Sequence, residues 1–180
     1  MIETERLRLR NWREGDAEEF IRTTNTDAVM RWLGGVRTRE QARETVARLT
    51  QWQEERGFTF WVVERKADGE MLGFCGLKIA DDPGSPVKGE IEAGWRFRED
   101  SWGQGYAREA AVATLDFAFR ELGAERVIAL TVDGNAPSWG LMLRLGMTRR
   151  PELDYEGPDW AEGTVIVHSI GKEAWQARTS

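Results

Sequence analysis

The strongest pattern of hydrophobic and polar positions lies between residues 89 and 123. It predicts a strand over residues 89–97, a glycine-rich loop over residues 101–106 and an amphipathic helix after the loop. Gly123 follows the helix and suits the left-handed conformation that ends many helices. The apolar residues of this helix share one face of a 3.6-residue repeat: Ala107, Ala111, Leu115, Ala118 and Leu122. We expect the rest of the chain to be organised around this strand–loop–helix unit.

The other patterned segments predict a mixture of helices and strands. Leu7 and Leu9 alternate with arginines, which predicts a half-buried strand with a solvated basic face. Thr38 and Gln41 have the spacing of a capping box, which opens a helix that runs to about Arg56. A turn at residues 67–70 joins two strands into a hairpin. The remaining predicted elements are a helix at 16–25, a helix from Asn135, and strands at 58–64, 72–80, 126–132, 147–150 and 163–170.

Length and composition fit one soluble α/β (α+β) domain over residues 1–180. The hydrophobic content is 41% and the charged content 31%, and no repeat or linker interrupts the pattern. No apolar run approaches the roughly 18 residues of a membrane span. A net charge of −6 argues against a general nucleic-acid surface. The single cysteine, and a charged N-terminus without a secretory signal, favour the cytoplasm.

The glycine-rich loop is suited to binding phosphate. Gly103 and Gly105 leave main-chain N–H groups unshielded at the positive end of the helix dipole. A dinucleotide motif would need a third glycine where Arg108 stands, and the acidic ribose partner about twenty residues on is missing. The Gly-Lys-Ser/Thr triplet of nucleoside triphosphate loops does not occur. The residues therefore predict an anion site but do not name the phosphate's owner.

Three blocks, in order along nearly the whole chain, resemble one family. Residues 102–107, Trp-Gly-Gln-Gly-Tyr-Ala, are similar to the acetyl-CoA pyrophosphate loop of the GNAT N-acetyltransferases, whose pattern is Gln/Arg-x-x-Gly-x-Gly/Ala. Gly105 and Ala107 fit that pattern, whereas Trp102 replaces the usual Gln or Arg. Residues 3–10, and residues 135–138 followed by Leu141 and 145–147, resemble the branch that includes ribosomal-protein N-terminal acetyltransferases.

The resemblance implies a fold, an activity and a set of binding residues. The fold would be a mixed, mostly antiparallel sheet of six to seven strands with about four helices. The activity would be transfer of an acetyl group from acetyl-CoA to a primary amine, on a protein N-terminus or a small molecule, without a metal; a homodimer stays open. The implied cofactor-binding residues are Trp95, Arg96, Phe97, Trp102, Gly103, Gln104, Gly105, Tyr106, Ala107, Arg108, Asn135 and Ser138.

The resemblance also suggests two catalytic residues and a role for the main chain. Glu92 matches a strand carboxylate that often serves as the base, and Glu90 lies two residues before it on the same predicted face. The alternative for Glu92 is a solvated or salt-bridged strand glutamate. Residues 95–97 follow, and their main-chain groups would pair with the pantetheine arm where the strand separates from its neighbour.

Residues 135–142 hold the candidate acid. Many family members place a tyrosine seven residues after the asparagine, and Met142 occupies that position here, so Ser138 remains as the acid. Ser138 could equally be a capping hydroxyl. Asn135, between Gly134 and Pro137, is expected first of all to cap the helix, and a cofactor contact is compatible with that role.

Several other features receive no catalytic role or stay open. Cys75 is expected to be a buried small residue, and His168 has no ligand partners in the sequence around it. An acidic segment at residues 152–162 would border the acceptor and either attract a cationic amine or form an ordinary solvated loop. Two alternatives to an acetyltransferase remain: a non-catalytic acyl-CoA-binding or interaction module, and an acyltransferase that uses a larger acyl group.

Overall fold

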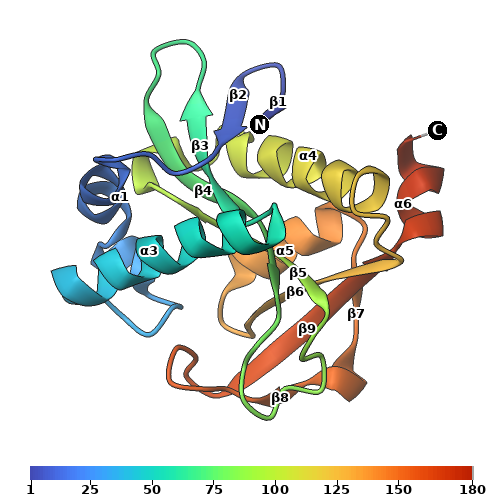
Figure 1. The fold of residues 1–180 in the computed structure, drawn as a ribbon. Helices are drawn as coiled ribbons and strands as arrows, with labels where there is room; N and C mark the ends of the chain where they lie inside the picture. The colour runs from blue at the N-terminus through green and yellow to red at the C-terminus, as the bar shows by residue number, and fades with distance from the viewer. Residues whose placement is uncertain (180) are drawn as a thin grey trace.

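One sheet forms the centre of the molecule in the computed structural model, which describes residues 1–179 (Figure 1). Its strands are β1 Ile2–Glu3, β2 Leu7–Arg10, β3 Phe60–Arg65, β4 Met71–Ile79, β5 Ile91–Phe97, β6 Arg126–Val132, β7 Thr148–Arg149, β8 Tyr155–Glu156 and β9 Thr164–Gly171. They lie in the order β1-β2-β3-β4-β5-β6-β9-β7, and β8 pairs with β9. All pairs are antiparallel except β5 with β6.

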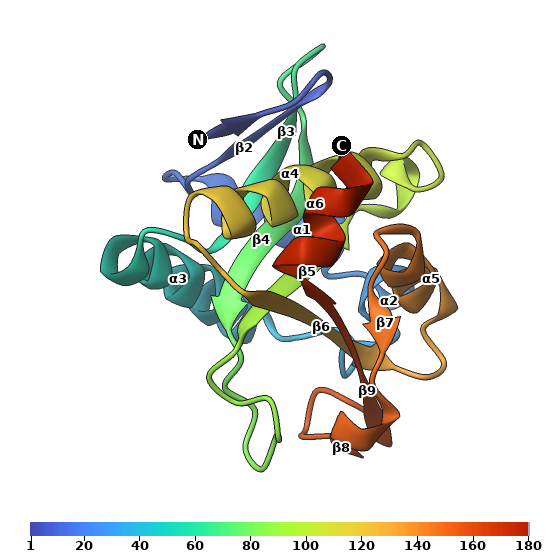
Figure 2. The same cartoon turned by 90° about the vertical axis from the view of Figure 1, so that its right-hand side faces the viewer.

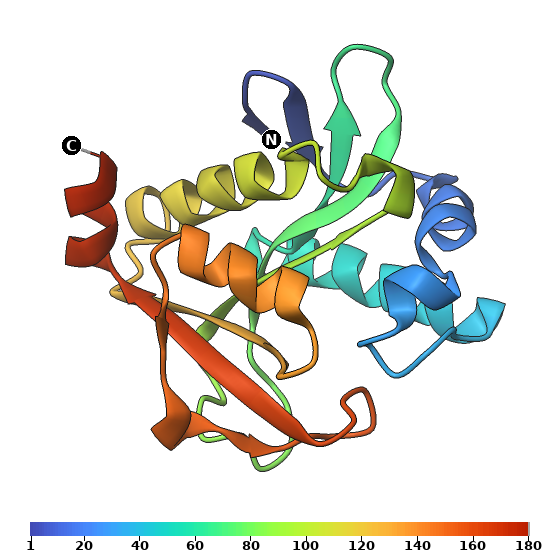
Figure 3. The same cartoon turned by 180° about the vertical axis from the view of Figure 1, so that it is seen from behind.

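Helices cover both faces of the sheet. They are α1 Asp16–Thr24, α2 Asp27–Met30, α3 Arg39–Arg56, α4 Tyr106–Arg120, α5 Ala136–Arg144 and α6 Lys172–Thr179. α3 faces the viewer in Figure 1, whereas α4 and α5 face the viewer in Figure 3. The larger core packs Leu115 of α4 and Met142 of α5 on the strands, and the smaller one joins Phe20 of α1 to Phe74 of β4. The side chains of β5 therefore alternate between two faces of the sheet that are both covered by helices.

The local signals of the sequence predicted most of these elements correctly. α3 begins with the capping box of Thr38 and Gln41 and ends at Gly57, whose φ is 77°. The hairpin of β3 and β4, the strand β6 and the helix α4 are also confirmed. Gly123 has the expected positive φ of 65°, although regular helix ends at Arg120. Each of these elements carries its own cap, turn or periodicity, so the sequence alone was sufficient.

The sheet has more strands than the six to seven expected. Within the described residues it has nine, and the additional ones include the two-residue strands β1 and β8. Two residues are too few to show an alternating pattern, so such strands arise only from pairing with a neighbour. The described residues also form six helices where about four were expected, and the additional ones are the one-turn α2 and the C-terminal α6. Figure 2 shows α6 beside α4, where Trp175 stacks on Phe119 with ring centroids 6.2 Å apart.

The prediction of a solvated basic face on β2 is wrong for Arg10, whereas the side chain of Arg8 is 36% exposed. Arg10 is buried and donates to Glu64 at 2.7 Å and to Asp16 at 2.7 Å, and Arg8 contacts the same Glu64 at 2.8 Å. The partner carboxylates lie on β3 and α1. Sequence alternation shows which residues share a face of a strand, but it cannot show that distant acidic residues meet that face.

Strands β5 and β6 separate along their length. They pair in parallel where Glu92 lies opposite Ile128, and beyond that point β5 continues beside β4 up to the Gly73–Phe97 pair (Figure 3). The separation expected near residues 95–97 is therefore present. Among the described residues, no helix combines the length and apolar character that crossing a membrane would require.

Candidate active site

The loop that precedes α4 has the backbone shape of an anion site. Gly103 and Gly105 have φ angles of 72° and 81°, a region that glycine enters without steric strain. Gly105 is the N-cap of α4, and no side chain of the described residues caps the helix there. A Cβ atom at Gly103 would meet no atom within 4 Å. The first N–H groups of α4 thus remain available for an anion at the positive end of the helix dipole.

Arg6 holds this loop in place. Its Nη1 donates to the main-chain oxygen of Gln104 at 3.0 Å, and its Nε lies 2.6 Å from Oε2 of Glu109 on α4. Its guanidinium carbon also lies 4.5 Å from the ring centre of Tyr106. The block at residues 3–10 resembles the family, but its contact with the loop could not be predicted, because about 100 residues separate Arg6 from Gln104 and Glu109.

The predicted cofactor residues of the loop divide by exposure. Trp102 is 49% exposed, and its Nε1 donates to the main-chain oxygen of Phe97 at 2.9 Å, which ties the loop to the end of β5. Tyr106 is buried in the core, so it can offer a ligand only its main chain. The side chains of Gln104 and Arg108 are exposed, and Ala107 is half-buried. The structure thus brings residues 95–97 and 102–108 together at one end of the sheet.

Glu92 is buried next to a lysine that the sequence analysis missed. Lys78 lies opposite Glu92 in the β4–β5 register, with its Nζ 3.4 Å from Oε2, and Nζ also donates to Asp81 at 2.9 Å. Burial raises the pKa of Glu92 to about 7, with Lys78 opposing and Asp82 reinforcing that rise. A carboxyl with this pKa exchanges a proton readily near neutral pH. The sequence signal for this contact was that Lys78 is the one charged residue in the apolar run of β4.

Asp82 connects two loops close to Glu92. It is buried, accepts a hydrogen bond from the hydroxyl of Tyr155 at 2.7 Å and accepts another from Nε1 of Trp160 at 3.1 Å. The loop between β4 and β5 is thereby fixed to the segment around β8. The sequence carried no signal for this contact, because more than 70 residues separate the partners.

Two expectations about acidic residues change. Glu90 precedes β5 and is ion-paired with Arg126, so it does not accompany Glu92 on the strand. In the segment at residues 152–162, Asp154 is ion-paired with Arg149, and Glu152 contacts Arg150 at 2.6 Å. These pairs neutralise part of the predicted acidic loop. The negative charge beside Glu92 comes from Asp81 and Asp82 instead.

The start of α5 holds the other predicted residues. Asn135 occupies the N-cap position, but its side chain makes no capping hydrogen bond, so the expected capping role is wrong. Its ψ of 64° differs from the extended backbone that usually turns a capping side chain toward the helix. Ser138 is half-buried on the first turn of α5. Met142 is buried in the core, where a tyrosine hydroxyl would have no access to solvent.

Cys75 and His168 lie within the protein interior. Cys75 is fully buried, as expected, and burial raises the pKa of its thiol to about 12, which leaves it protonated and unreactive. His168 is 2% exposed, and burial lowers its pKa with a contribution from Arg149. The described residues contain no cluster of three His, Cys, Asp or Glu side chains that could hold a metal ion.

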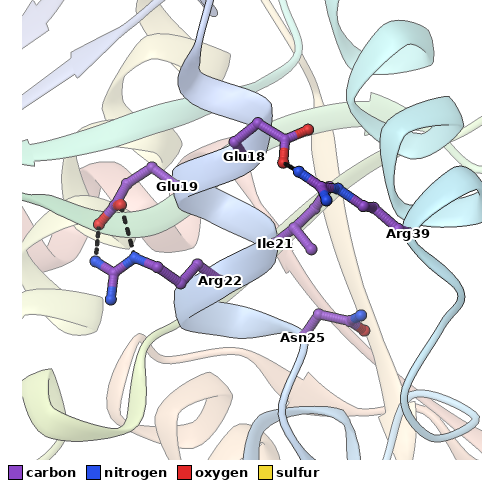
Figure 4. Close-up of a pocket in the computed structure, with 6 residues that line it drawn as sticks. All are labelled: Glu18, Glu19, Ile21, Arg22, Asn25 and Arg39. Atoms are coloured by element: carbon purple, nitrogen blue, oxygen red, sulfur yellow. Dashed lines mark hydrogen bonds and ion pairs between the residues drawn. The ribbon is translucent and has the colours of Figure 1, made fainter.

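A surface hollow beside α1 is not part of this arrangement. Figure 4 shows that it is lined by Ile21, Asn25 and four charged side chains that already pair with one another. Glu19 pairs with Arg22 at 2.7 Å, and Glu18 pairs with Arg39. These partnered charges leave little capacity for binding a ligand.

Comparison with known proteins places the chain in a family. A family model described as an acetyltransferase (GNAT) domain matches residues 6–148. The uncharacterised protein YkkB of Bacillus subtilis strain 168 is 34% identical over 145 residues, covering 80% of this chain and 83% of that protein.

Solved structures share the fold. A GNAT-family acetyltransferase from Bacillus anthracis superposes with a TM-score of 0.78 at 26% identity, over 96% of this chain and 98% of that one. The ribosomal-protein-S5-alanine acetyltransferase of Vibrio fischeri gives a TM-score of 0.74 at 16% identity over 96% and 97% of the two chains, a likeness of fold alone. The family match and the relatives agree with the glycine-rich loop before α4 and the separation of β5 from β6. The chain therefore belongs to the GNAT family of acetyltransferases.

Proposed function

We propose that this protein is an acetyl-CoA-dependent N-acetyltransferase, cytoplasmic and built as one domain over residues 1–180. It transfers the acetyl group to a primary amine by direct attack within a ternary complex. The observation that carries the proposal is a buried carboxyl, Glu92, with a pKa near 7, on the strand that leads into the phosphate-binding loop. Such a group is placed to accept a proton from an amine.

The chain's own groups fit coenzyme A as the cosubstrate. The loop at residues 102–108 offers main-chain N–H donors and positive φ glycines to the pyrophosphate, and Arg108 adds an exposed cation. Main-chain groups of residues 95–97, where β5 leaves β6, would pair with the pantetheine arm. The thioester supplies an activated acetyl group, and Asn135 and Ser138 lie at the start of the helix on the other side of the separation.

Glu92 acts as the general base in the proposed reaction. A primary alkyl amine has a pKa near ~10, so at neutral pH only about one molecule in a thousand is the free base. The amine nitrogen forms a bond to the thioester carbonyl carbon, the carbon–sulfur bond breaks, and the proton from nitrogen passes to Glu92 directly or through water. The thiol of coenzyme A has a pKa of about 8.5, so its thiolate leaves readily and depends less on an acid. Ser138 is the residue proposed to protonate that thiolate.

Two measurements test this proposal. Isothermal titration should show acetyl-CoA binding to the wild type and none to Gly105→Asp, because the carboxylate would stand against the pyrophosphate at a backbone angle that strains aspartate. A screen of amines followed by free-thiol release should then identify an acceptor. Equal acetyl-CoA affinity in both proteins would remove the loop assignment. Tight binding without turnover of any amine would favour the non-catalytic module, and turnover only with a larger acyl-CoA would replace the acetyl group.

A further inference from the structure

The face of β5 that bears Glu92 also bears an arginine without a carboxylate partner. Side chains alternate along a strand, so Glu92, Gly94 and Arg96 share one face. Ala93 and Phe97 belong to the opposite face, because both pack in the core with α4. The register agrees, since Lys78 lies opposite Glu92 and Phe74 opposite Arg96. In the proposed reaction this is the face that meets the amine acceptor.

Arg96 lies against a pair of stacked aromatic rings instead of acids. Its guanidinium carbon lies 5.5 Å from the ring centre of Phe20 and 5.2 Å from that of Phe74. Its Nε is buried and makes no hydrogen bond within the described part of the chain. No carboxylate of residues 1–179 forms an ion pair with it, and the neighbouring charge is another cation, Arg37.

This environment differs from that of other partly buried arginines in the protein. Arg10, Arg98 and Arg149 each bond to one or more carboxylates. Burial, with a contribution from Arg37, lowers the pKa of Arg96 to about 10, so the side chain is still a cation at neutral pH. Burying a charge without a hydrogen-bonded partner is unfavourable, and contact with two rings offsets only part of that penalty. The Nε of Arg96 thus keeps a hydrogen-bond donor that no group of the described residues uses.

We propose that the amine acceptor carries a carboxylate, which the guanidinium of Arg96 binds while its amine lies at Glu92. This inference rests on the proposed acetyltransferase function and specifies the acceptor of the same site. A planar guanidinium matches a planar carboxylate through two parallel hydrogen bonds. Arg37 adds positive charge at that end, whereas Asp81 and Asp82 add negative charge at the end where the amine would lie.

The spacing limits which acceptors fit. Glu92 and Arg96 are four residues apart on a strand, so their Cα atoms are about 13 Å apart. Side chains on one face of a strand stand roughly perpendicular to the sheet, and a free α-amino acid, whose amine and carboxylate are adjacent, is much shorter than this separation. We therefore expect a longer acceptor, such as a peptide with a free N-terminus and an acidic group further along, or an extended ω-amino acid.

A series of matched acceptors tests this inference. The probes are 6-aminohexanoate, 8-aminooctanoate and 11-aminoundecanoate, each compared with its own primary amide by thiol release from acetyl-CoA. The wild type should prefer at least one acid over its amide by about 10- to 100-fold in kcat/KM, the range of a charge-assisted hydrogen bond. Arg96→Gln should bring that ratio close to one, and Arg96→Lys should keep part of it. Arg22→Gln, which removes an exposed arginine paired with Glu19, is the control and should keep the full preference.

Binding of the same pairs in the presence of coenzyme A separates the two hypotheses. Carboxylate-dependent binding that Arg96→Gln abolishes, without thiol release, would support the acceptor assignment while refuting the transferase. Turnover of acids and amides at equal rates by the wild type would overturn the acceptor assignment alone. A preference that survives in Arg96→Gln, or the absence of both carboxylate-dependent binding and turnover, would overturn it as well. Unchanged acetyl-CoA affinity of Arg96→Gln shows that the variant is folded.

Discussion

Replacing Lys78 by methionine should move the pH dependence of catalysis toward higher pH. The Nζ atom of Lys78 lies 3.4 Å from the buried Oε2 of Glu92 and favours its charged form. Over that distance, Coulomb's law gives about 1 kcal/mol in water and about 5 kcal/mol at an effective dielectric of about 20. One pKa unit corresponds to about 1.4 kcal/mol. Loss of the lysine should therefore raise the pKa of Glu92 from about 7 by at least about 1 unit.

The assay is the ratio of kcat/KM between Lys78→Met and wild type from pH 5.5 to 9.5, with one amine and saturating acetyl-CoA. Ionisation of the amine cancels in this ratio, so what remains reports the enzyme group. Since the base must be deprotonated, the variant should be at least about tenfold slower at pH 6, and the ratio should rise toward one as the pH passes the raised pKa of Glu92. Lys78→Arg, which keeps the cation, should remain near the wild type. Lys66→Met removes a lysine paired with Glu3 and should give a ratio near one throughout. A ratio for Lys78→Met that is independent of pH, or that rises toward low pH, would refute the assignment of Glu92 as the base.

The remaining predictions concern the same groups. Glu92→Gln should abolish most turnover yet stabilise the fold by about 3 kcal/mol at pH 8. The pKa of Glu92 is raised from 4.5 to about 7 in the folded state, so the wild-type protein loses stability as the pH rises through that window. Denaturant unfolding should therefore show little difference between the two proteins at pH 4. Asp82→Asn removes a negative charge that raises the pKa of Glu92, so the acid limb of kcat/KM should move to lower pH, opposite to Lys78→Met. Arg6→Ala should raise the KM for acetyl-CoA with a smaller change in kcat, since Arg6 contacts the loop at Gln104, and equal KM values would argue against that bracing role.

The conformation of the glycine-rich loop and the helix after it were predictable from the sequence because their signals are local. The positive φ angles of Gly103 and Gly105 and the periodicity of α4 all lie within one short stretch. The environment of Glu92 was not predictable. Its pKa depends on Lys78, which strand pairing brings opposite, and on Asp82, whose place is fixed by Tyr155 from far along the chain.

Local rules also failed for two side chains, Asn135 and Arg10. Asn135 has the residue type and the flanking sequence of a helix cap, yet its backbone angles leave the side chain without the capping bond. Arg10 has the alternation of a solvated strand residue, yet Glu64 and Asp16 enclose it. In both cases the sequence identified the element correctly and misjudged the side chain, because the partners of a side chain are determined by tertiary packing.

The two-residue period of β5 explains how one short strand can serve two ligands. Glu92 and Arg96 point to the face where the proposed acceptor lies, while Ala93 and Phe97 anchor the strand against α4. Side chains on both faces are thus committed, which leaves the main chain along the edge that separates from β6 for the proposed cosubstrate. A substitution at Arg96 should therefore change acceptor choice without changing acetyl-CoA affinity. A substitution at Gly105 should lower acetyl-CoA affinity without changing acceptor choice. The two sites are then separable by mutation although they meet on a single strand–loop unit.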